Sequence, residues 1–116
     1  MKVRDINIES IIEIINNIVK DFEWNDRIRR IGVFGSLARG EASEDSDIDF
    51  IVDYEYKYSS NDEIINEVKR QFQLDEILRN VFSPIELSIV TLQAIEDEHD
   101  IEFKIAIERD VVWVYE

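Results

Sequence analysis

The opening part of the chain carries an apolar stripe at helical spacing. Ile11, Ile15 and Ile18 recur every three or four residues within residues 8–22, which predicts a helix with one buried side. Asn7 stands directly before this stretch and is suited to cap the helix, because its side-chain oxygen can accept a hydrogen bond from a backbone amide. We expect a packing helix whose polar side faces water.

Two short apolar runs follow, and each has the composition of a buried strand. Residues 28–34 and 48–54 are rich in Ile, Val and Phe and lie between polar segments. Gly35 marks the end of the first run, and Ser36 is a suitable N-cap for a short helical turn. Residues 41–46 are polar, which indicates a loop between the two predicted strands.

The middle of the chain predicts a second long helix, over residues 61–79, with Ser60 or Asn61 as its cap. Its apolar positions recur at helical spacing, and the apolar side continues beyond an expected kink. The residues that this pattern predicts to be buried are Ile64, Val68 and Phe72, followed by Leu74, Ile77 and Leu78.

The last third of the chain predicts a strand, a helix and a final strand. Pro84 opens a predicted strand over residues 85–90, where its missing N–H is tolerated at the strand start. A last helix is predicted over residues 91–107, in which His99 aligns with apolar positions and is expected to pack at the edge of the core. Residues 111–115 complete the pattern as a strand.

The predicted order of elements is α-β-(turn)-β-α-β-α-β, which favours an α/β (α+β) fold. We expect a single mixed sheet of about four strands flanked by helices on one or both faces. The 116 residues fit one domain, residues 1–116, and no repeat or low-complexity linker divides them.

Charge changes the picture of what such a domain binds. The formal net charge is −14, from 27 acidic and 13 basic residues. A field of this sign repels nucleic acid, so we expect no direct nucleic-acid role, and a nucleotide triphosphate would need a cation to accompany it. A basic protein partner is the natural complement. The plainer alternative is that the acidity only keeps a small protein in solution.

Composition also bears on location. The chain has no cysteine, which excludes disulfides and thiolate zinc sites. No apolar run approaches the roughly 20 residues that a membrane span needs, and no signal-peptide pattern opens the chain. We therefore expect a soluble, cytoplasmic protein without membrane contact.

The candidate chemistry lies between the two predicted strands of the first half. Gly35 permits close approach of the backbone to an oxyanion, and Ser36 adds a hydroxyl. Arg39 follows three residues after Ser36 and shares its side of a helical turn, where it can reach a phosphate or offset nearby acids. An isolated Gly-Ser pair is more often an ordinary turn, so this pair needs support from its surroundings.

Asp47 and Asp49 provide that support. Alternation along a strand points both carboxylates to one side. Carboxylate oxygens are preferred ligands of Mg²⁺, so the pair predicts a divalent-cation site at residues 47 and 49. Taken alone, such a pair is more often the solvated start of a strand in an acidic protein.

The two features together resemble a known family. Residues 35–40 are Gly-Ser-Leu-Ala-Arg-Gly, residues 46–49 are Ser-Asp-Ile-Asp, and ten residues separate Ser36 from Asp47. This arrangement resembles the minimal nucleotidyltransferases of the polymerase-β-like superfamily. The resemblance implies that fold, a nucleotide bound through its triphosphate by the Gly-Ser turn, and Mg²⁺ held by the two aspartates.

The family pattern also has a third carboxylate, usually Asp, on a later strand. Glu86 stands at the matching place in the predicted strand 85–90. The resemblance makes Glu86 a candidate third metal ligand and general base, with Glu in place of the usual Asp. The candidate catalytic residues are therefore Asp47, Asp49 and Glu86, and the candidate nucleotide-binding residues are Gly35, Ser36 and Arg39.

Stand-alone domains of this kind resemble the antitoxins of toxin–antitoxin modules whose toxin is a HEPN-type ribonuclease. The resemblance implies transfer of AMP from ATP, with Mg²⁺, to a tyrosine hydroxyl of that toxin. Three alternatives stay open: an antitoxin that acts by binding and occlusion alone, a small-molecule transferase of the aminoglycoside type, and an acidic domain without a ligand. The acceptor, the number of AMP units, the nucleotide preference and assembly into homo- or hetero-oligomers are equally open.

Overall fold

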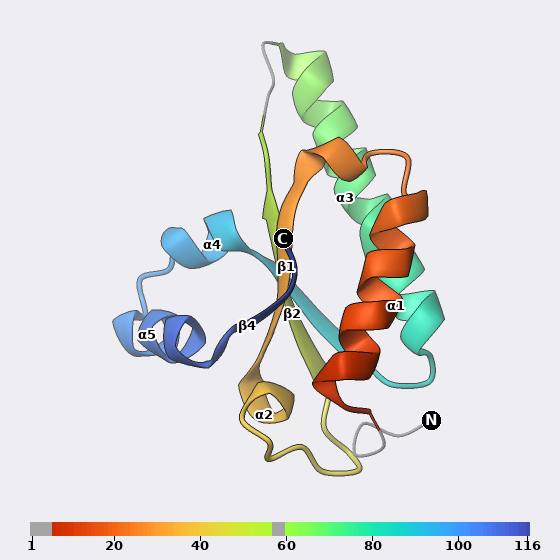
Figure 1. The fold of residues 1–116 in the computed structure, drawn as a ribbon. Coiled ribbons are helices and arrows are strands. Elements are labelled where there is room, and N and C mark those ends of the chain that lie inside the picture. Colours follow the sequence, from red (N-terminus) through yellow and green to blue (C-terminus); the bar gives the residue numbers. More distant parts are fainter. Residues whose placement is uncertain (1–5, 57–59) are drawn as a thin grey trace.

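The computed structural model describes residues 6–56 and 60–116. Figure 1 shows a sheet with helices on both sides and a short helix, α2, at the strand ends. The elements are α1 (Ile8–Asp21), the 3₁₀ helix η2 (Asn25–Arg27), β1 (Ile28–Phe34), α2 (Gly35–Ala38), β2 (Ile48–Tyr54), α3 (Asn61–Phe82), β3 (Leu87–Thr91), α4 (Leu92–Glu96), α5 (Ile101–Asp110) and β4 (Val112–Tyr115).

The strands form one four-stranded mixed sheet in the order β3-β2-β1-β4. β1 pairs antiparallel with both β2 and β4, and β2 pairs in parallel with β3. A parallel pair needs a crossover connection, which α3 supplies. The predicted single mixed sheet of about four strands, flanked by helices, is confirmed.

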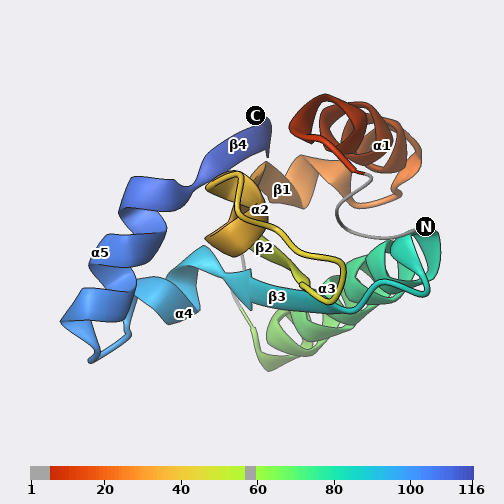
Figure 2. The same cartoon turned by 90° about the horizontal axis from the view of Figure 1, so that it is seen from below.

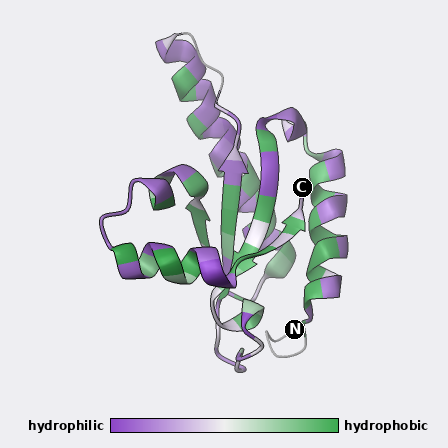
Figure 3. Cartoon of the chain, turned by 60° about the vertical axis from the view of Figure 1, so that its left-hand side comes forward, coloured by the Kyte–Doolittle hydropathy of each residue, from purple (hydrophilic) through white to green (hydrophobic). Residues whose placement is uncertain are grey.

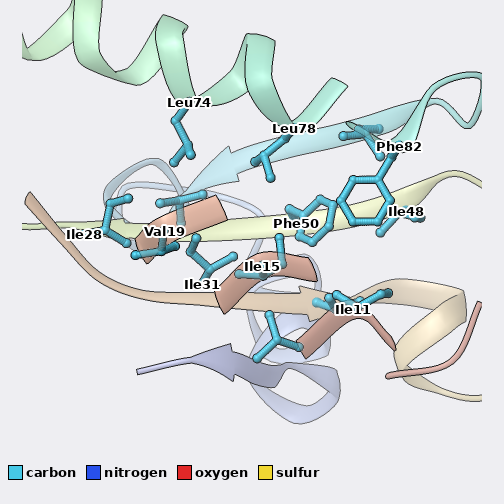
Figure 4. Close-up of a cluster of buried hydrophobic side chains, with 14 of the residues drawn as sticks. Ile11, Ile15, Val19, Ile28, Ile31, Ile48, Phe50, Leu74, Leu78 and Phe82 are labelled. Carbon is cyan, nitrogen blue, oxygen red and sulfur yellow. The ribbon is translucent and has the colours of Figure 1, made fainter. Parts of the chain in front are cut away.

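Helices cover both faces of the sheet unequally. α1 and α3 lie on one face, and α4 and α5 lie on the other (Figures 1 and 2). The first face holds the larger core, in which Phe50 packs against Phe82 with ring centroids 5.5 Å apart (Figure 4). The smaller core on the second face is formed by Phe34, Ile51, Ile95 and Ile107. Because strand residues alternate between faces, β2 contributes to both cores.

The first helix forms as its pattern predicts. Ile11 and Ile15 are fully buried, and α1 alternates hydrophobic and hydrophilic positions along its length in Figure 3. The Asn7 side chain accepts a hydrogen bond from the Ser10 amide at 2.8 Å, so the predicted N-cap is confirmed. The predicted strands 28–34 and 48–54 match β1 and β2.

The prediction for the middle helix is correct in position and wrong in its buried side. α3 runs to Phe82 as one helix, capped by the Ser60 side chain. Its buried apolar residues are Leu74, Leu78 and Phe82, whereas Ile64, Val68 and Phe72 are exposed. The physical reason is the side of the helix that packs: Glu67, at 3% exposure, is in line with Leu74 and Leu78. The stripe of Ile64, Val68 and Phe72 lies roughly 100° around the helix from that line, so it stays exposed.

The single helix predicted over residues 91–107 is two helices in the structure. α4 ends at Glu96 and α5 begins at Ile101, with the Asp100 side chain capping α5 through the Phe103 amide at 3.1 Å. His99 lies exposed in the intervening loop, so its predicted packing role is wrong. The polar run Asp97–Asp100 offers caps and solvation instead of an apolar face, which breaks the helix.

The remaining differences are small shifts at element ends. β3 begins at Leu87, so Glu86 stands one residue before the strand, and β4 begins at Val112. Ser36 lies inside α2, whose N-cap residue is Phe34 without a side-chain cap, so the predicted capping by Ser36 is wrong. Among the helices of residues 6–56 and 60–116, none has the length and apolarity to cross a membrane.

The two halves of α3 should differ sharply in their contribution to stability. Leu78→Ala removes a fully buried side chain and should lower the free energy of unfolding by about 2–5 kcal/mol. Phe72→Ala, at a side chain 68% exposed, should change it by less than about 0.5 kcal/mol. Urea unfolding followed by circular dichroism measures both, and a large loss from Phe72→Ala would contradict the observed packing of α3.

Candidate functional site

The candidate site lies where β1 ends and β2 begins. Phe34 pairs with Asp49 across these two antiparallel strands, so Gly35 directly follows the residue opposite Asp49. We name the group Gly35, Ser36, Asp47 and Asp49 the acidic corner. Figure 2 looks onto this end of the sheet, with α2 between the ends of β1 and the start of β2.

Gly35 is required at the acidic corner on two counts. Its φ of +73° lies in the left-handed region, which side chains other than glycine rarely adopt. A Cβ at this position would also collide with Oδ2 of Asp49 and lie 3.0 Å from its Cγ. The Asp49 carboxylate therefore rests directly against the backbone of the turn.

Asp47 and Asp49 lie close enough to influence one another. Asp49 is half-buried and Asp47 is exposed at the strand start. Burial raises the pKa of the Asp49 carboxyl above its ordinary value, the nearby Asp47 raises it further, and Arg39 opposes both. Two neighbouring carboxylates that repel each other, one of them half-buried, are a donor set that fits Mg²⁺. This ion binds through one or two carboxylates and completes its shell with water and substrate phosphates.

Arg39 stands at the end of α2 in a network of acids. Its Nε donates to Glu41 Oε2 at 3.0 Å and its Nη1 donates to Asp110 Oδ2 at 3.0 Å. Hydrogen bonds from Arg109 and then Arg39 hold the pKa of the Asp110 carboxyl below its ordinary value. The guanidinium is thus held between two carboxylates beside the acidic corner, and its tie to Asp110 joins α2 to α5.

Ser36 is half-buried within α2. Its carbonyl oxygen accepts a hydrogen bond from the Glu41 amide at 2.8 Å, which closes the chain after α2 into a tight turn. Gly40, at a φ of +74°, makes that turn possible. Ser36 therefore lies on a backbone segment that is held at Gly35 by the contact with Asp49 and at Glu41 by this hydrogen bond.

Glu86 lies beside the acidic corner without joining it. Its carbonyl oxygen accepts a hydrogen bond from the Ile48 amide at 3.1 Å, and Ser88, two residues on, pairs with Asp49 in register. The Glu86 side chain is exposed. Within the described ranges, no three His, Cys, Asp or Glu side chains gather closely enough to hold a metal ion. The structure brings Asp47 and Asp49 together and leaves the carboxylate of Glu86 apart.

Sequence reasoning missed Asp110, although a signal for it exists. An acidic residue in the last turn of a helix is disfavoured by the helix dipole unless a cation compensates. Asp110 is such a residue in α5, its side chain is only 7% exposed, and Arg109 and Arg39 are its partners. The signal shows that Asp110 needs a cation, but only the fold identifies Arg39, which is 71 residues away in sequence.

Aromatic residues of the predicted strand region do not lie at the acidic corner. Tyr54 is buried in the larger core at the far end of β2, and its ring meets that of Tyr56 edge to face at 6.3 Å. Burial raises the pKa of the Tyr54 hydroxyl far above its ordinary value. Tyr54 and Tyr56 are therefore not placed to stack on the base of a nucleotide held at the acidic corner, and Tyr58 lies outside the described residues.

A cavity of about 300 Å³ lies farther along the second face, between α4, α5 and the sheet. Arg30 covers the Trp113 ring at its edge, with the guanidinium carbon 3.9 Å from the ring centroid. The six residues predicted for catalysis and nucleotide binding do not line it. The lining residues are Arg30, Ile51, Leu92, Ile95, Glu96, Lys104, Ile107, Glu108, Val111 and Trp113.

Comparisons with known proteins bear on this site. A family model described as "Nucleotidyltransferase domain" matches residues 15–112, which include the whole acidic corner. Protein adenylyltransferase MntA of Thermococcus cleftensis is 46% identical over 50 residues, which are 43% of this chain and 50% of that protein. A Methanocaldococcus jannaschii protein named "Putative protein adenylyltransferase MJ1215" is 32% identical over 82% of this chain and 100% of its own length.

A solved structure gives the corresponding comparison of folds. The structure described as "Structure of putative minimal nucleotidyltransferase" superposes with a TM-score of 0.53 and covers 92% of this chain and 95% of its own. At 22% identity this likeness shows the fold alone. The mixed sheet flanked by helices that is described above agrees with this likeness of fold.

The contact between Gly35 and Asp49 should appear in a double-mutant cycle. Gly35→Ala should cost about 1–3 kcal/mol of unfolding free energy, from left-handed strain and from the collision with Asp49. In an Asp49→Ala background the collision disappears, and the cost should fall by at least about 0.5 kcal/mol.

Gly40→Ala is the matched control for that cycle, because Gly40 has a φ of +74° and no atom within 4 Å of the position of a Cβ. Its cost should be the same with Asp49 present or replaced. Equal costs of Gly35→Ala in both backgrounds, measured by urea unfolding, would contradict the packing of Asp49 on the turn.

The raised pKa of Asp49 predicts a variant that stabilises the protein. The folded state holds the Asp49 proton more tightly than the unfolded state, so stability rises as pH falls through the raised pKa, and the ionised carboxylate costs stability at neutral pH. Asp49→Asn without divalent cations at pH 7 should therefore raise the melting temperature by about 2–4 °C, a modest gain because the group is partly solvated.

Asp45→Asn is the control for net charge, because Asp45 is an exposed acid in the loop that precedes β2. It should leave the melting temperature within about 1 °C of the wild type. A lower melting temperature for Asp49→Asn than for Asp45→Asn in scanning calorimetry would contradict the unfavourable charge at position 49.

Proposed function

This chain belongs to the nucleotidyltransferase domain family and is a nucleotidyltransferase of the minimal type, and on that premise we propose that it transfers AMP from ATP to a tyrosine hydroxyl of a partner protein. The observation that carries the proposal is the packing of the Asp49 carboxylate against the Gly35 turn. This packing puts a backbone suited to phosphate and a carboxylate pair suited to a divalent cation at one point of the fold.

The turn is the proposed anchor of the nucleotide. Gly35 leaves the backbone open to close approach, and the Ser36 hydroxyl beside it would hold the β- and γ-phosphates. Arg39 would exchange one of its carboxylate partners, the exposed Glu41, for the charge that develops on the leaving pyrophosphate. Asp110 would keep the guanidinium in place during that exchange.

Asp47 and Asp49 are the proposed holders of Mg²⁺. When bound, the ion would supply neutralisation of the phosphate charge and orientation of the phosphate oxygens. The role of the two side chains is to fix the nucleotide over the strand start and to balance the cation. This assignment agrees with a chain of net charge −14, which would otherwise repel a triphosphate.

The proposed reaction is an in-line displacement at the α-phosphorus of ATP. The hydroxyl oxygen of the acceptor forms a bond to that phosphorus, the bond to the bridging oxygen of the β-phosphate breaks, and pyrophosphate leaves with the electron pair. The hydroxyl proton passes to a base, for which Glu86 is the candidate. Glu86 is exposed beside the start of β2, so an acceptor docked over the acidic corner could meet it.

The proposed acceptor is a HEPN-type ribonuclease toxin, which the transfer would silence. Two relatives carry the name protein adenylyltransferase, which supports a protein acceptor for this chain as well. The large negative charge supports a basic partner.

One observation favours a second candidate, an antitoxin that acts by binding alone. The Glu86 carboxylate is not gathered with Asp47 and Asp49, and Arg39 is already held by two acids. A chain with that arrangement could occlude a partner without modifying it. The two candidates differ in whether the aspartates are needed.

Transfer of label separates the candidates. The wild type, Mg²⁺ and ATP labelled at the α-phosphate should label a HEPN-type ribonuclease encoded beside this chain, and ATP labelled at the γ-phosphate should not. Asp47→Ala should lower labelling by at least about 100-fold, because a proposed metal ligand is lost. Asp45→Ala, on the same loop, should label normally.

Two outcomes would count against adenylyl transfer. The first is the absence of α-label on the ribonuclease with the wild type. The second is full neutralisation of ribonuclease activity by both Asp47→Ala and Asp49→Ala, which would favour binding alone.

A further inference from the structure

We propose that Phe103 on α5 forms a nucleobase-binding site next to the acidic corner, with its ring stacking on the base of the bound nucleotide. The inference rests on the proposed function, because it needs a nucleotide whose phosphates lie at Gly35 and Ser36. It adds a residue outside the predicted site and a reason for nucleotide preference.

The ion pair of Asp110 with Arg39 fixes which side of α5 faces the acidic corner. Asp110 Oδ2 lies 3.0 Å from Arg39 Nη1 at the end of α2. On another side of the same helix, Lys104 Nζ reaches the carbonyl oxygen of Glu96 in α4 at 3.4 Å. α5 therefore presents one side to α2 and another to α4. Figures 1 and 2 show this arrangement from two directions.

Phe103 lies on the side that faces α2. It precedes Asp110 by seven residues, which is close to two full turns of an α-helix, so the two side chains point in nearly the same direction. Lys104, one residue on, is rotated by roughly 100° toward α4. Phe103 therefore lies on the same side of α5 as Asp110, nearer to the outer end of the helix at Ile101.

The Phe103 ring has no place in either core. Its side chain is 41% exposed, whereas Ile107, one turn later, is 3% exposed and belongs to the smaller core. Its backbone is fixed, because its amide donates to the Asp100 cap at 3.1 Å. Figure 3 shows α5 on the outside of the molecule, with hydrophobic and hydrophilic positions both present along it. An exposed aromatic ring on a fixed backbone is a low-entropy platform for a flat apolar ligand.

The spacing suits a nucleotide. Seven residues of helix separate Phe103 from Asp110 by about 10 Å along the axis. That separation is comparable with the length of a nucleotide from its phosphate chain to its base. A nucleotide anchored at the acidic corner and extended along α5 would therefore bring its base to Phe103. Stacking needs only the flat face of the base, so it favours the larger purines without excluding other bases.

The main rival occupant is a side chain of the partner protein, which would also fit an exposed aromatic residue. The two occupants predict different losses. A base platform affects the affinity for ATP in the absence of any partner, whereas a docking residue affects only the modification of the partner.

Isothermal titration calorimetry of the whole chain with Mg²⁺ tests the inference, using ATP and inorganic tripolyphosphate as probes. Phe103→Ala should weaken ATP binding by at least about fivefold, the loss expected when one stacked base is released. Tripolyphosphate, which has no base, should bind as to the wild type. Phe103→Trp should restore ATP binding, and Ile105→Ala, at a residue 56% exposed on the outer side of the same helix, should leave both affinities unchanged.

Each other outcome has a defined meaning. Unchanged ATP affinity in Phe103→Ala would overturn the base site, and an equal loss for both probes would show a structural effect on the corner and overturn it as well. A failure of Phe103→Trp to restore binding would exclude stacking. A wild type that binds neither probe would overturn the proposed function, and the base site with it. Normal binding by the wild type together with unchanged binding by Phe103→Ala would overturn the base site alone.

Discussion

The contact between the Asp49 carboxylate and the backbone of Gly35 is the constraint on which the rest of the site depends. It exists because β1 and β2 are antiparallel neighbours, so the end of one strand meets the start of the other. The same register sets Asp47 at the strand entrance, and the parallel β3 sets Ser88 on the other side of Asp49. The two cores, on opposite faces of the sheet, hold this register through residues that belong to neither the turn nor the acids. The sheet thus does the positioning, and the turn supplies an open backbone.

The charges around the acidic corner determine which kind of ligand it favours. In a chain of net charge −14, the guanidinium of Arg39 at the edge of the acidic corner is shared by Glu41 and Asp110. A carboxylate pair with a raised pKa and a guanidinium held by acids together favour the arrival of a cation with its own anionic ligand. This is the balance that a metal–nucleotide complex brings, and neither ion alone satisfies it.

How far the sequence leads can be judged from particular residues. The strands around the corner were predictable because their apolar runs end at Gly35 and begin after Asp47, and local pattern decides such boundaries. The buried side of α3 could not be predicted, because Ile64 and Phe72 repeat at helical spacing whether or not a sheet lies beneath them. The tie between Arg39 and Asp110 was equally hidden, since 71 residues separate them and only the packing of α5 beside α2 joins them. For Glu86, the position of the backbone beside the site could be predicted from the order of the strands. The direction of its exposed side chain could not be predicted.

Two glycines have a left-handed conformation, Gly35 as the first residue of α2 and Gly40 just after its end, and this has a consequence for how such enzymes diverge. Few substitutions are tolerated at either glycine, because almost any other residue strains the backbone there. New specificities must then accumulate in segments that tolerate substitution, such as the outer half of α5 and the loop before Asp47. An engineer seeking an altered acceptor or base would do well to randomise those segments and keep the glycines invariant.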